Sequence, residues 1–114
     1  MKMTLTRAQI WKVIDLANGQ NTHELCAYLK DIEYSALLDV EALMLYGREL
    51  MYGDGLESFE DIYRSVYDEW GGKNGDKEMA IAYIAGKTPL AQYLESAIEV
   101  LYLTSDAKIS FQGE

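Results

Sequence analysis

The sequence predicts an all-α fold, a compact single-domain bundle of five to seven helices that closes with a C-terminal helical hairpin. Apolar residues recur at the spacing of a helix along most of the chain. Residues that cap helices stand before these apolar segments. The alternating pattern of a strand is nowhere longer than Ile109–Phe111, and Pro89 is the single proline.

The first two helices are predicted from their caps. Thr6 followed three residues later by Gln9 has the form of a capping box, and an apolar helical face comes directly after it. This places a first helix over about residues 7–17. Asn21 or Thr22 then caps a short second helix.

A long third helix and an amphipathic fourth helix are expected in the centre of the chain. The third runs from about Ser35 to Met51, and its stretch Ala42–Tyr46 is apolar on all sides, so it should be buried. Ser58, with Asp61 three residues later, starts the fourth helix. The charged residues of this segment are expected to face the solvent: Glu57, Glu60, Asp61, Arg64 and Asp68.

The C-terminal hairpin is predicted at residues 79–103. Its two arms, Met79–Ala85 and Pro89–Leu103, are both apolar enough to be buried, and we expect them to pack on the third helix. Gly86 is expected to end the first arm with a positive φ. Thr88 is expected to cap the second arm.

Gly86-Lys87-Thr88 also matches the end of a phosphate-binding loop, but the surrounding residues exclude that interpretation. The full motif needs a glycine where this chain has Ile81, and a strand where it has a helical pattern. Pro89 also lacks the backbone N–H that a phosphate would use. The segment is therefore expected to form a helix corner and no nucleotide site.

Composition limits the class of protein. The chain has 114 residues, of which 49% are hydrophobic, and this suits one globular domain. We expect a single helical domain at residues 1–103 and a loose C-terminal tail at 104–114, in which Ile109–Phe111 is able to form a short extended piece on the surface. Cys26 is the single cysteine, and there is no basic-then-apolar leader and no apolar run of about 18 residues. These features predict a reduced, cytoplasmic protein that does not bind a membrane.

The formal net charge of −9 is concentrated in the middle of the chain. Residues 24–69 hold twelve carboxylates against Lys30, Arg48 and Arg64, whereas the charges of the two flanking parts cancel. Such a field opposes direct binding to nucleic acid, because that affinity comes largely from Lys and Arg on phosphates, and it suits a basic protein partner. A surface that only keeps the protein soluble is the favoured interpretation of this charge, and a dedicated acidic docking surface is the alternative.

Short segments of the third helix, the fourth helix and the corner occur together in a known family. They are Ala42-Leu43-Met44 with Gly47-Arg48, Phe59–Trp70, Tyr83–Gly86, Thr88-Pro89-Leu90 and Tyr93-Leu94. In these segments the chain resembles the small bacterial all-helical proteins catalogued as domain of unknown function 3775, and the resemblance covers roughly two-thirds of the chain. It implies an all-helical fold and carries no established activity.

Catalytic and metal-binding patterns are incomplete in this sequence. His23 and Cys26 are three residues apart on the second helix, but zinc takes four ligands, and a Cys–His nucleophile needs an orienting group and an oxyanion pocket. Glu57, Glu60 and Asp61 are expected on a solvated face, where general acid catalysis at neutral pH is poor. We therefore expect no catalytic residue, no cofactor and no metal, in a protein that is not an enzyme.

Two further groups of residues are candidates for contacts. Arg48 follows the most apolar stretch, and we expect its guanidinium to bond to carbonyls at the helix end or to a carboxylate of a neighbouring helix, with anion binding as the alternative. Val100, Tyr102 and Leu103 belong to an apolar run that is hard to bury on one side of a helix. This run is a candidate surface for self-association as a homodimer.

These observations favour a small acidic protein-interaction or regulatory module without catalytic activity, whose partner is a protein, in particular a basic one. The alternative is an inhibitor from a phage or mobile element, whose acidic surface mimics nucleic acid and occupies a basic groove of a nuclease or DNA-binding protein. Mimicry requires the carboxylates of residues 24–69 to cluster on one exposed surface. The charged face of the fourth helix is the candidate interaction surface for either function.

Overall fold

The computed structural model describes residues 2–53, 57–70, 75–103 and 110–113. Within these ranges the chain forms six helices and two short strands. In chain order they are β1 (Lys2–Thr6), α1 (Arg7–Asn18), α2 (Thr22–Asp31), α3 (Tyr34–Tyr52), α4 (Phe59–Trp70), α5 (Lys77–Ala85), α6 (Leu90–Leu103) and β2 (Ser110–Gln112). The predicted all-α fold is confirmed.

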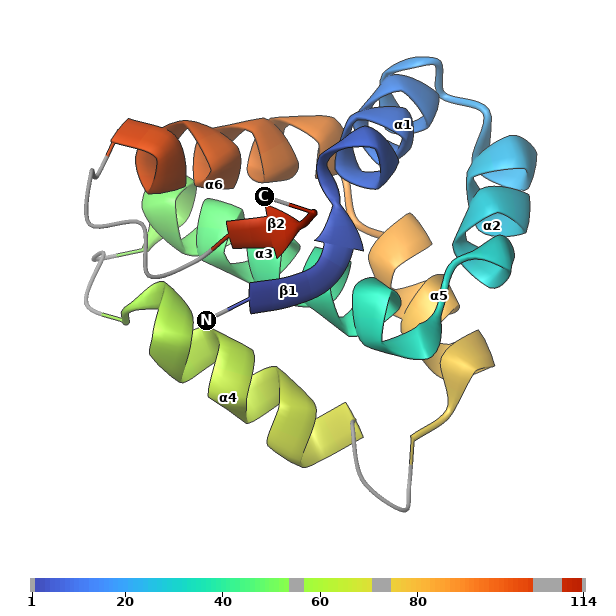
Figure 1. The fold of residues 1–114 in the computed structure, drawn as a ribbon. Helices are drawn as coiled ribbons and strands as arrows, with labels where there is room; N and C mark the ends of the chain where they lie inside the picture. The colour runs from blue at the N-terminus through green and yellow to red at the C-terminus, as the bar shows by residue number, and fades with distance from the viewer. Residues whose placement is uncertain (1, 54–56, 71–74, 104–109, 114) are drawn as a thin grey trace.

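Helix α3 is the central helix of the bundle. Every residue from Ala36 to Met44 is buried, as expected for the middle of this helix. Helices α4, α5 and α6 and strand β1 all pack on α3, and Figure 1 shows α6 and α4 on opposite sides of it. Although α3 is the longest helix in the described ranges, neither it nor any other helix there is long and apolar enough to cross a membrane.

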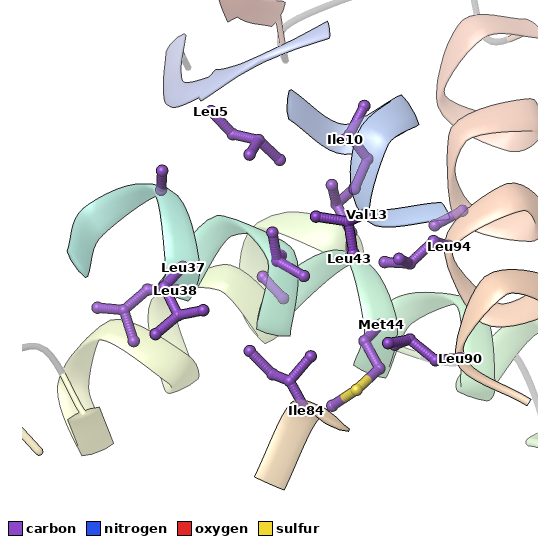
Figure 2. Close-up of a cluster of buried hydrophobic side chains, with 14 of the residues drawn as sticks. Leu5, Ile10, Val13, Leu37, Leu38, Leu43, Met44, Ile84, Leu90 and Leu94 are labelled. Carbon is purple, nitrogen blue, oxygen red and sulfur yellow. The ribbon is translucent and has the colours of Figure 1, made fainter. Parts of the chain in front are cut away.

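The core joins α3 to both ends of the helical sequence. Figure 2 shows Leu43 of α3 beside Val13 of α1, and Met44 beside Leu90 of α6 and Ile84 of α5. These five side chains are at most 4% exposed. Full burial of one such side chain stabilises a fold by about 2 kcal/mol, so these contacts help to hold α5 and α6 on α3, while α1 packs chiefly on α6 and α2.

The predicted caps of the first, second and fourth helices are confirmed, whereas Thr88, expected to cap the second arm of the hairpin, stands two residues before the first residue of α6, Leu90. The Gln9 N–H donates to Thr6 Oγ1 at 3.1 Å, and the Thr6 N–H donates to Gln9 Oε1 at 2.9 Å, which completes the capping box of α1. Asn21 and Ser58 cap α2 and α4 with a side-chain oxygen that accepts a backbone N–H of the first turn. Asp76 does the same for α5.

The corner between α5 and α6 differs from the predicted one in its backbone. Gly86 ends α5 with a φ of −79°, so the expected positive φ is wrong. The helix ends instead with a hydrogen bond from the Gly86 N–H to the Ala82 carbonyl oxygen. The Thr88–Pro89 peptide bond is cis, and α6 begins at the next residue, Leu90. Both arms pack on α3 as expected and then diverge, since α5 also contacts α2 whereas α6 also contacts α1.

The first and last described segments pair in a small parallel sheet. The sequence analysis expects no alternating run longer than Ile109–Phe111, and strand β1 shows that this expectation is wrong. Strands β1 and β2 pair with Lys2 opposite Ser110 and Thr6 opposite Gln112. β1 has five residues. Its apolar residues alternate with polar ones, and in the structure this alternation places the apolar residues inside.

The tail predicted to be loose at residues 104–114 is partly a structural element. Residues 110–112 form β2, in agreement with the short extended piece that the sequence allows at Ile109–Phe111, but Phe111 is buried and does not lie on the surface. Phe111 is 5% exposed and lies in the same core as Met3 and Leu5 of β1. Burial of the Phe111 ring is favourable, and it holds residues 110–112 against the core. Residues 104–109 lie outside the described residues.

Gly47 allows α3 and α6 to approach each other closely, and its replacement tests this contact. A Cβ atom on Gly47 would overlap the carbonyl group of Tyr93 and lie 2.8 Å from Tyr93 Cα. Gly47→Ala is therefore expected to lower the free energy of unfolding by about 2 kcal/mol or more, measured by urea denaturation.

Gly19→Ala is the control for this prediction. Gly19 has a φ of −72°, and a Cβ atom there would lie 3.5 Å from the Asp15 carbonyl oxygen, an ordinary contact. Gly19→Ala should unfold within about 1 kcal/mol of the wild type. Equal stability of the two variants would contradict a close approach of α6 to α3 at Gly47.

Candidate functional site

A groove between α3 and α4 is the candidate site. Its volume is about 360 Å³, and residues of the C-terminal half of α3 and along α4 line it. In the described part of the chain, α4 packs on α3 and shares at most marginal contacts with any other element. The groove therefore follows the single interface that holds α4 on the bundle.

The groove combines an apolar surface with an excess of carboxylates. Ile62 and Val66 are buried and Leu45 is half-buried. The charged residues that line the groove are more open to solvent; they are Arg48, Glu49, Glu57 and Glu69. A side chain with an aliphatic stem and a cationic head matches both properties, because the stem can lie on apolar residues while the head faces carboxylates.

The charged face predicted for α4 lies on the outside of that helix. Glu57, Asp61, Arg64 and Asp68 are exposed, while Glu60 is half-buried. Arg64 lies 3.9 Å from Asp61, and an exposed pair of this kind contributes little energy. The face is net acidic, and it adjoins the groove because Glu57 belongs to both.

The fold divides the acidic middle of the chain into separate parts. Asp39 and Glu41 are buried in α3, so they add nothing to the exposed charge. The carboxylates of residues 24–33 lie on and next to α2, which Figure 1 shows well away from α4. Six carboxylates of the described residues remain at the groove and on the face of α4: Glu49, Glu57, Glu60, Asp61, Asp68 and Glu69.

Asp39 is a buried carboxylate that accepts hydrogen bonds from two other elements. The backbone N–H groups of Thr4 and Leu5 in β1 donate to its Oδ2 at 2.8 and 3.0 Å. The Tyr67 hydroxyl of α4 donates to its Oδ1 at 3.0 Å and lies 2.9 Å from the Ser35 carbonyl oxygen. Burial raises the pKa of Asp39, and these hydrogen bonds oppose the rise. Asp39 therefore ties both β1 and α4 to α3.

Glu41 is the second buried carboxylate of α3, and among the described residues it has no hydrogen-bond partner. The residue is 0% exposed, and no donor is within hydrogen-bond reach of Oε1 or Oε2. Burial, followed by the nearby carboxylate of Glu69 on α4, raises the pKa of Glu41 to about 7. Glu41 stands one helical turn before Leu45 on the same face of α3. Leu45 and Glu69 both line the groove, whereas Glu41 is not among its lining residues and lies covered, close enough to Glu69 to feel its charge.

Asp39 and Glu41 are the site residues that the sequence analysis does not single out. The signal is present in the chain, since these two carboxylates interrupt the otherwise apolar stretch Ala36–Met44. A carboxylate inside a fully buried helix needs a partner or a shifted pKa. If Asp39 and Glu41 are treated as part of the acidic surface, their position inside an apolar stretch is overlooked.

The other residues singled out from the sequence do not form a common site. Arg48 is exposed in the groove, and with the other described residues it forms neither the helix-end bond nor the carboxylate bond expected of it. On α2, His23 is exposed and Cys26 is half-buried. In the described ranges, no three His, Cys, Asp or Glu residues lie together in a way that could hold a metal ion.

A second pocket, of about 500 Å³, lies beside the corner between α5 and α6. The end of α1 and the start of α2 complete its lining. Lys87 in the corner has its amine 4.4 Å from the centre of the Tyr83 ring, a cation–π contact that gives this lysine a structural role. The segment before the corner is helix α5, in agreement with the exclusion of a phosphate-binding loop.

The predicted self-association surface is described only in part. Val100 is half-buried on α6. The side chains of Tyr102 and Leu103 lie outside the part of the chain that the structure describes. Formation of a homodimer therefore stays a prediction.

Comparison with known proteins adds no identity to this geometry. No family model, no curated protein and no solved structure matches the chain. The resemblance to domain of unknown function 3775 therefore stays a prediction. The groove, its charges and the two buried carboxylates are the features that indicate a function.

The role of Asp39 as a tie between elements is tested at Tyr67. Tyr67→Phe removes the hydroxyl that donates to the buried carboxylate, and a lost hydrogen bond to a charged group costs about 2 kcal/mol of unfolding free energy. Tyr52→Phe is the matched control, because Tyr52 is 68% exposed. The control should change stability by less than about 0.5 kcal/mol in urea denaturation. Equal effects of the two substitutions would contradict the tie.

Replacing Glu41 by glutamine is expected to stabilise the protein at neutral pH and to leave its stability unchanged in acid. The pKa of Glu41 in the folded protein, about 7, stands above the ordinary value of 4.5, so the folded state holds this proton more tightly than the unfolded chain. The stability that depends on this proton is full below pH 4.5 and is lost as the pH rises to about 7. Because Glu41→Gln removes the titration, its gain in unfolding free energy should grow to about 3 kcal/mol at neutral pH.

Urea denaturation at a series of pH values measures this difference. Glu49→Gln is the control, since Glu49 lines the same groove and is only half-buried. Its unfolding free energy should follow the wild type within about 0.5 kcal/mol. A difference between Glu41→Gln and wild type that does not change with pH would show that the buried carboxyl does not titrate as described.

Proposed function

We propose that this protein is a non-catalytic cytoplasmic docking module that binds a basic protein partner through the α3–α4 groove and the adjoining face of α4. The observation that carries the proposal is the charge of this surface. Six carboxylates lie there, against Arg48 and Arg64. A basic segment that lies along α4 would be attracted by the whole surface and would find apolar contacts in the groove.

The nature of the partner follows from the sign of the charge and from the shape of the surface. Direct binding to nucleic acid or to an anionic membrane is disfavoured, because both carry the same sign of charge as this face. The groove has a small volume, about 360 Å³. A volume of this size suits individual side chains of a docked protein segment. We therefore favour a protein with Lys or Arg residues on its docking segment.

The nucleic-acid mimic is the second candidate, and it uses the same surface. It is favoured by the series of exposed carboxylates along one helix, Glu57, Asp61 and Asp68. It is weakened by the division of the acidic segment, because the carboxylates of α2 lie away from α4. The identity of the captured partner separates the two functions, since a mimic binds a nuclease or DNA-binding protein and competes with DNA for it.

Charge reversal on α4 tests the proposed function. Asp61→Lys with Asp68→Lys is expected to abolish capture of the partner from host lysate at low salt, about 50 mM NaCl, where surface charges are weakly screened. The wild-type protein should retain the partner at low salt and lose it at about 500 mM NaCl. Captured proteins are compared by mass spectrometry across the variants.

Glu95→Lys with Glu99→Lys is the matched control. Both residues are exposed on α6, which lies across α3 from α4, and the double substitution changes the net charge by the same amount. This variant should capture the same partner as the wild type. A partner lost equally from both double variants, or retained by both, would contradict docking on α4.

A further inference from the structure

We infer that Glu41 is the anchoring group of the groove: a lysine or arginine side chain of the partner enters between α3 and α4 and pairs with the carboxylates of Glu41 and Glu69. This inference rests on the proposed function. It adds the type of side chain that the groove receives and the residue that receives it.

The missing partner of Glu41 is the first observation behind this inference. Both of its carboxylate oxygens are buried without a donor, while Asp39, on the same helix, receives three. A buried carboxylate left without a donor costs free energy. A guanidinium or ammonium group supplies charge and several N–H donors at once.

The position of Glu41 next to residues that line the groove is the second observation. Leu45, one turn later on α3, and Glu69, on the last turn of α4, line the groove on its two sides. The two carboxylates repel each other across the α3–α4 interface, since Glu69 contributes to the raised pKa of Glu41. A cation placed between them would be attracted to both helices.

The attachment of α4 makes this position reachable. In the described part of the chain, α4 packs substantially on α3 alone. Entry of a cation therefore requires a displacement of the end of α4 that carries Glu69. Such a displacement would leave the packing of α5, α6 and β1 on α3 in place and would act on the hydrogen bonds that Tyr67 donates to Asp39 and Ser35.

The charged groups around Glu41 do not replace the missing donor. Glu69 faces it from α4, and the Tyr34 phenol near it on α3 has its pKa raised by burial first and then by Glu41. The Lys77 amine of α5 donates its hydrogen bonds to the carbonyl oxygens of Lys30 and Ile32. The charge of Asp76, before α5, contributes to the raised pKa of Tyr34. The charged residues of α6 and β1 are exposed: Glu95, Glu99 and Lys2.

Anchoring at Glu41 couples binding to loss of a proton. With a pKa of about 7, Glu41 is about half protonated near neutral pH in the free protein. A paired cation keeps it ionised, so binding releases about half a proton to the buffer at neutral pH. Affinity should then rise about tenfold from about pH 6 to about pH 8.

Calorimetric titration with an octa-arginine peptide tests the inference, because guanidinium groups stay protonated in this range. The protein carries His23→Gln, which removes its one histidine, a residue type that titrates at these pH values. Proton release is measured from the binding enthalpy in buffers of different ionisation enthalpy. We expect about half a proton released at neutral pH and the tenfold rise of affinity with pH.

Adding Glu41→Gln should weaken binding at about pH 8 by about tenfold or more and remove its pH dependence. Adding Glu99→Gln, which takes an exposed carboxylate from α6 on the other side of α3, should change the affinity less than about threefold and keep the pH dependence. Circular dichroism checks that both variants fold. If the Glu41→Gln variant is unfolded, the proton release measured with the His23→Gln protein is the test of anchoring at Glu41.

If the peptide binds in a salt-dependent way but releases no proton, or if the two variants behave alike, anchoring at Glu41 is wrong and docking on α4 still stands. Absence of any binding at low salt would overturn both the anchor and the proposed function.

Discussion

The complete burial of one stretch of α3, Ala36–Met44, is the constraint on which the rest of the structure depends. Once the stretch Ala36–Met44 lies inside, each neighbouring element must offer α3 either an apolar side chain or a partner for a polar one. Helices α1, α5 and α6 do the first, through the contacts around Leu43 and Met44. Strand β1 and helix α4 do the second at Asp39. Asp39 thus adds hydrogen bonds to the apolar contacts that hold β1 and α4 on α3.

Glu41 is the place where this constraint is not met. Its carboxylate has the burial of Asp39 without the donors, so its ionised form destabilises the folded chain. A buried polar group without a hydrogen-bond partner is expected at a functional site, where another molecule can supply the missing partner. The same residue can therefore lower stability and raise affinity, and the two effects have one physical cause.

The parts of the fold that depend on neighbours in sequence could be predicted, and the parts that depend on distant residues could not. Helix starts at Thr6, Asn21 and Ser58 follow from a side chain and a backbone group three residues apart. The pairing of β1 with β2 joins Lys2 to Ser110, and a strand of three residues has too little periodicity to detect. The expected φ of Gly86 is wrong because glycine permits a positive φ without requiring one.

The candidate site shows the same limit and a consequence of it. The sequence supplies the total charge and the outward face of α4, but only the packing of α4 on α3 decides that Glu41 is covered and that Glu69 stands beside it. Apolar contacts hold the two helices together there against the repulsion of two carboxylates. A cation between them would reverse the sign of that interaction and seat α4 more firmly on α3. Binding of a basic partner and the position of α4 are therefore coupled, because the repulsion that weakens the interface in the free protein becomes attraction in the complex.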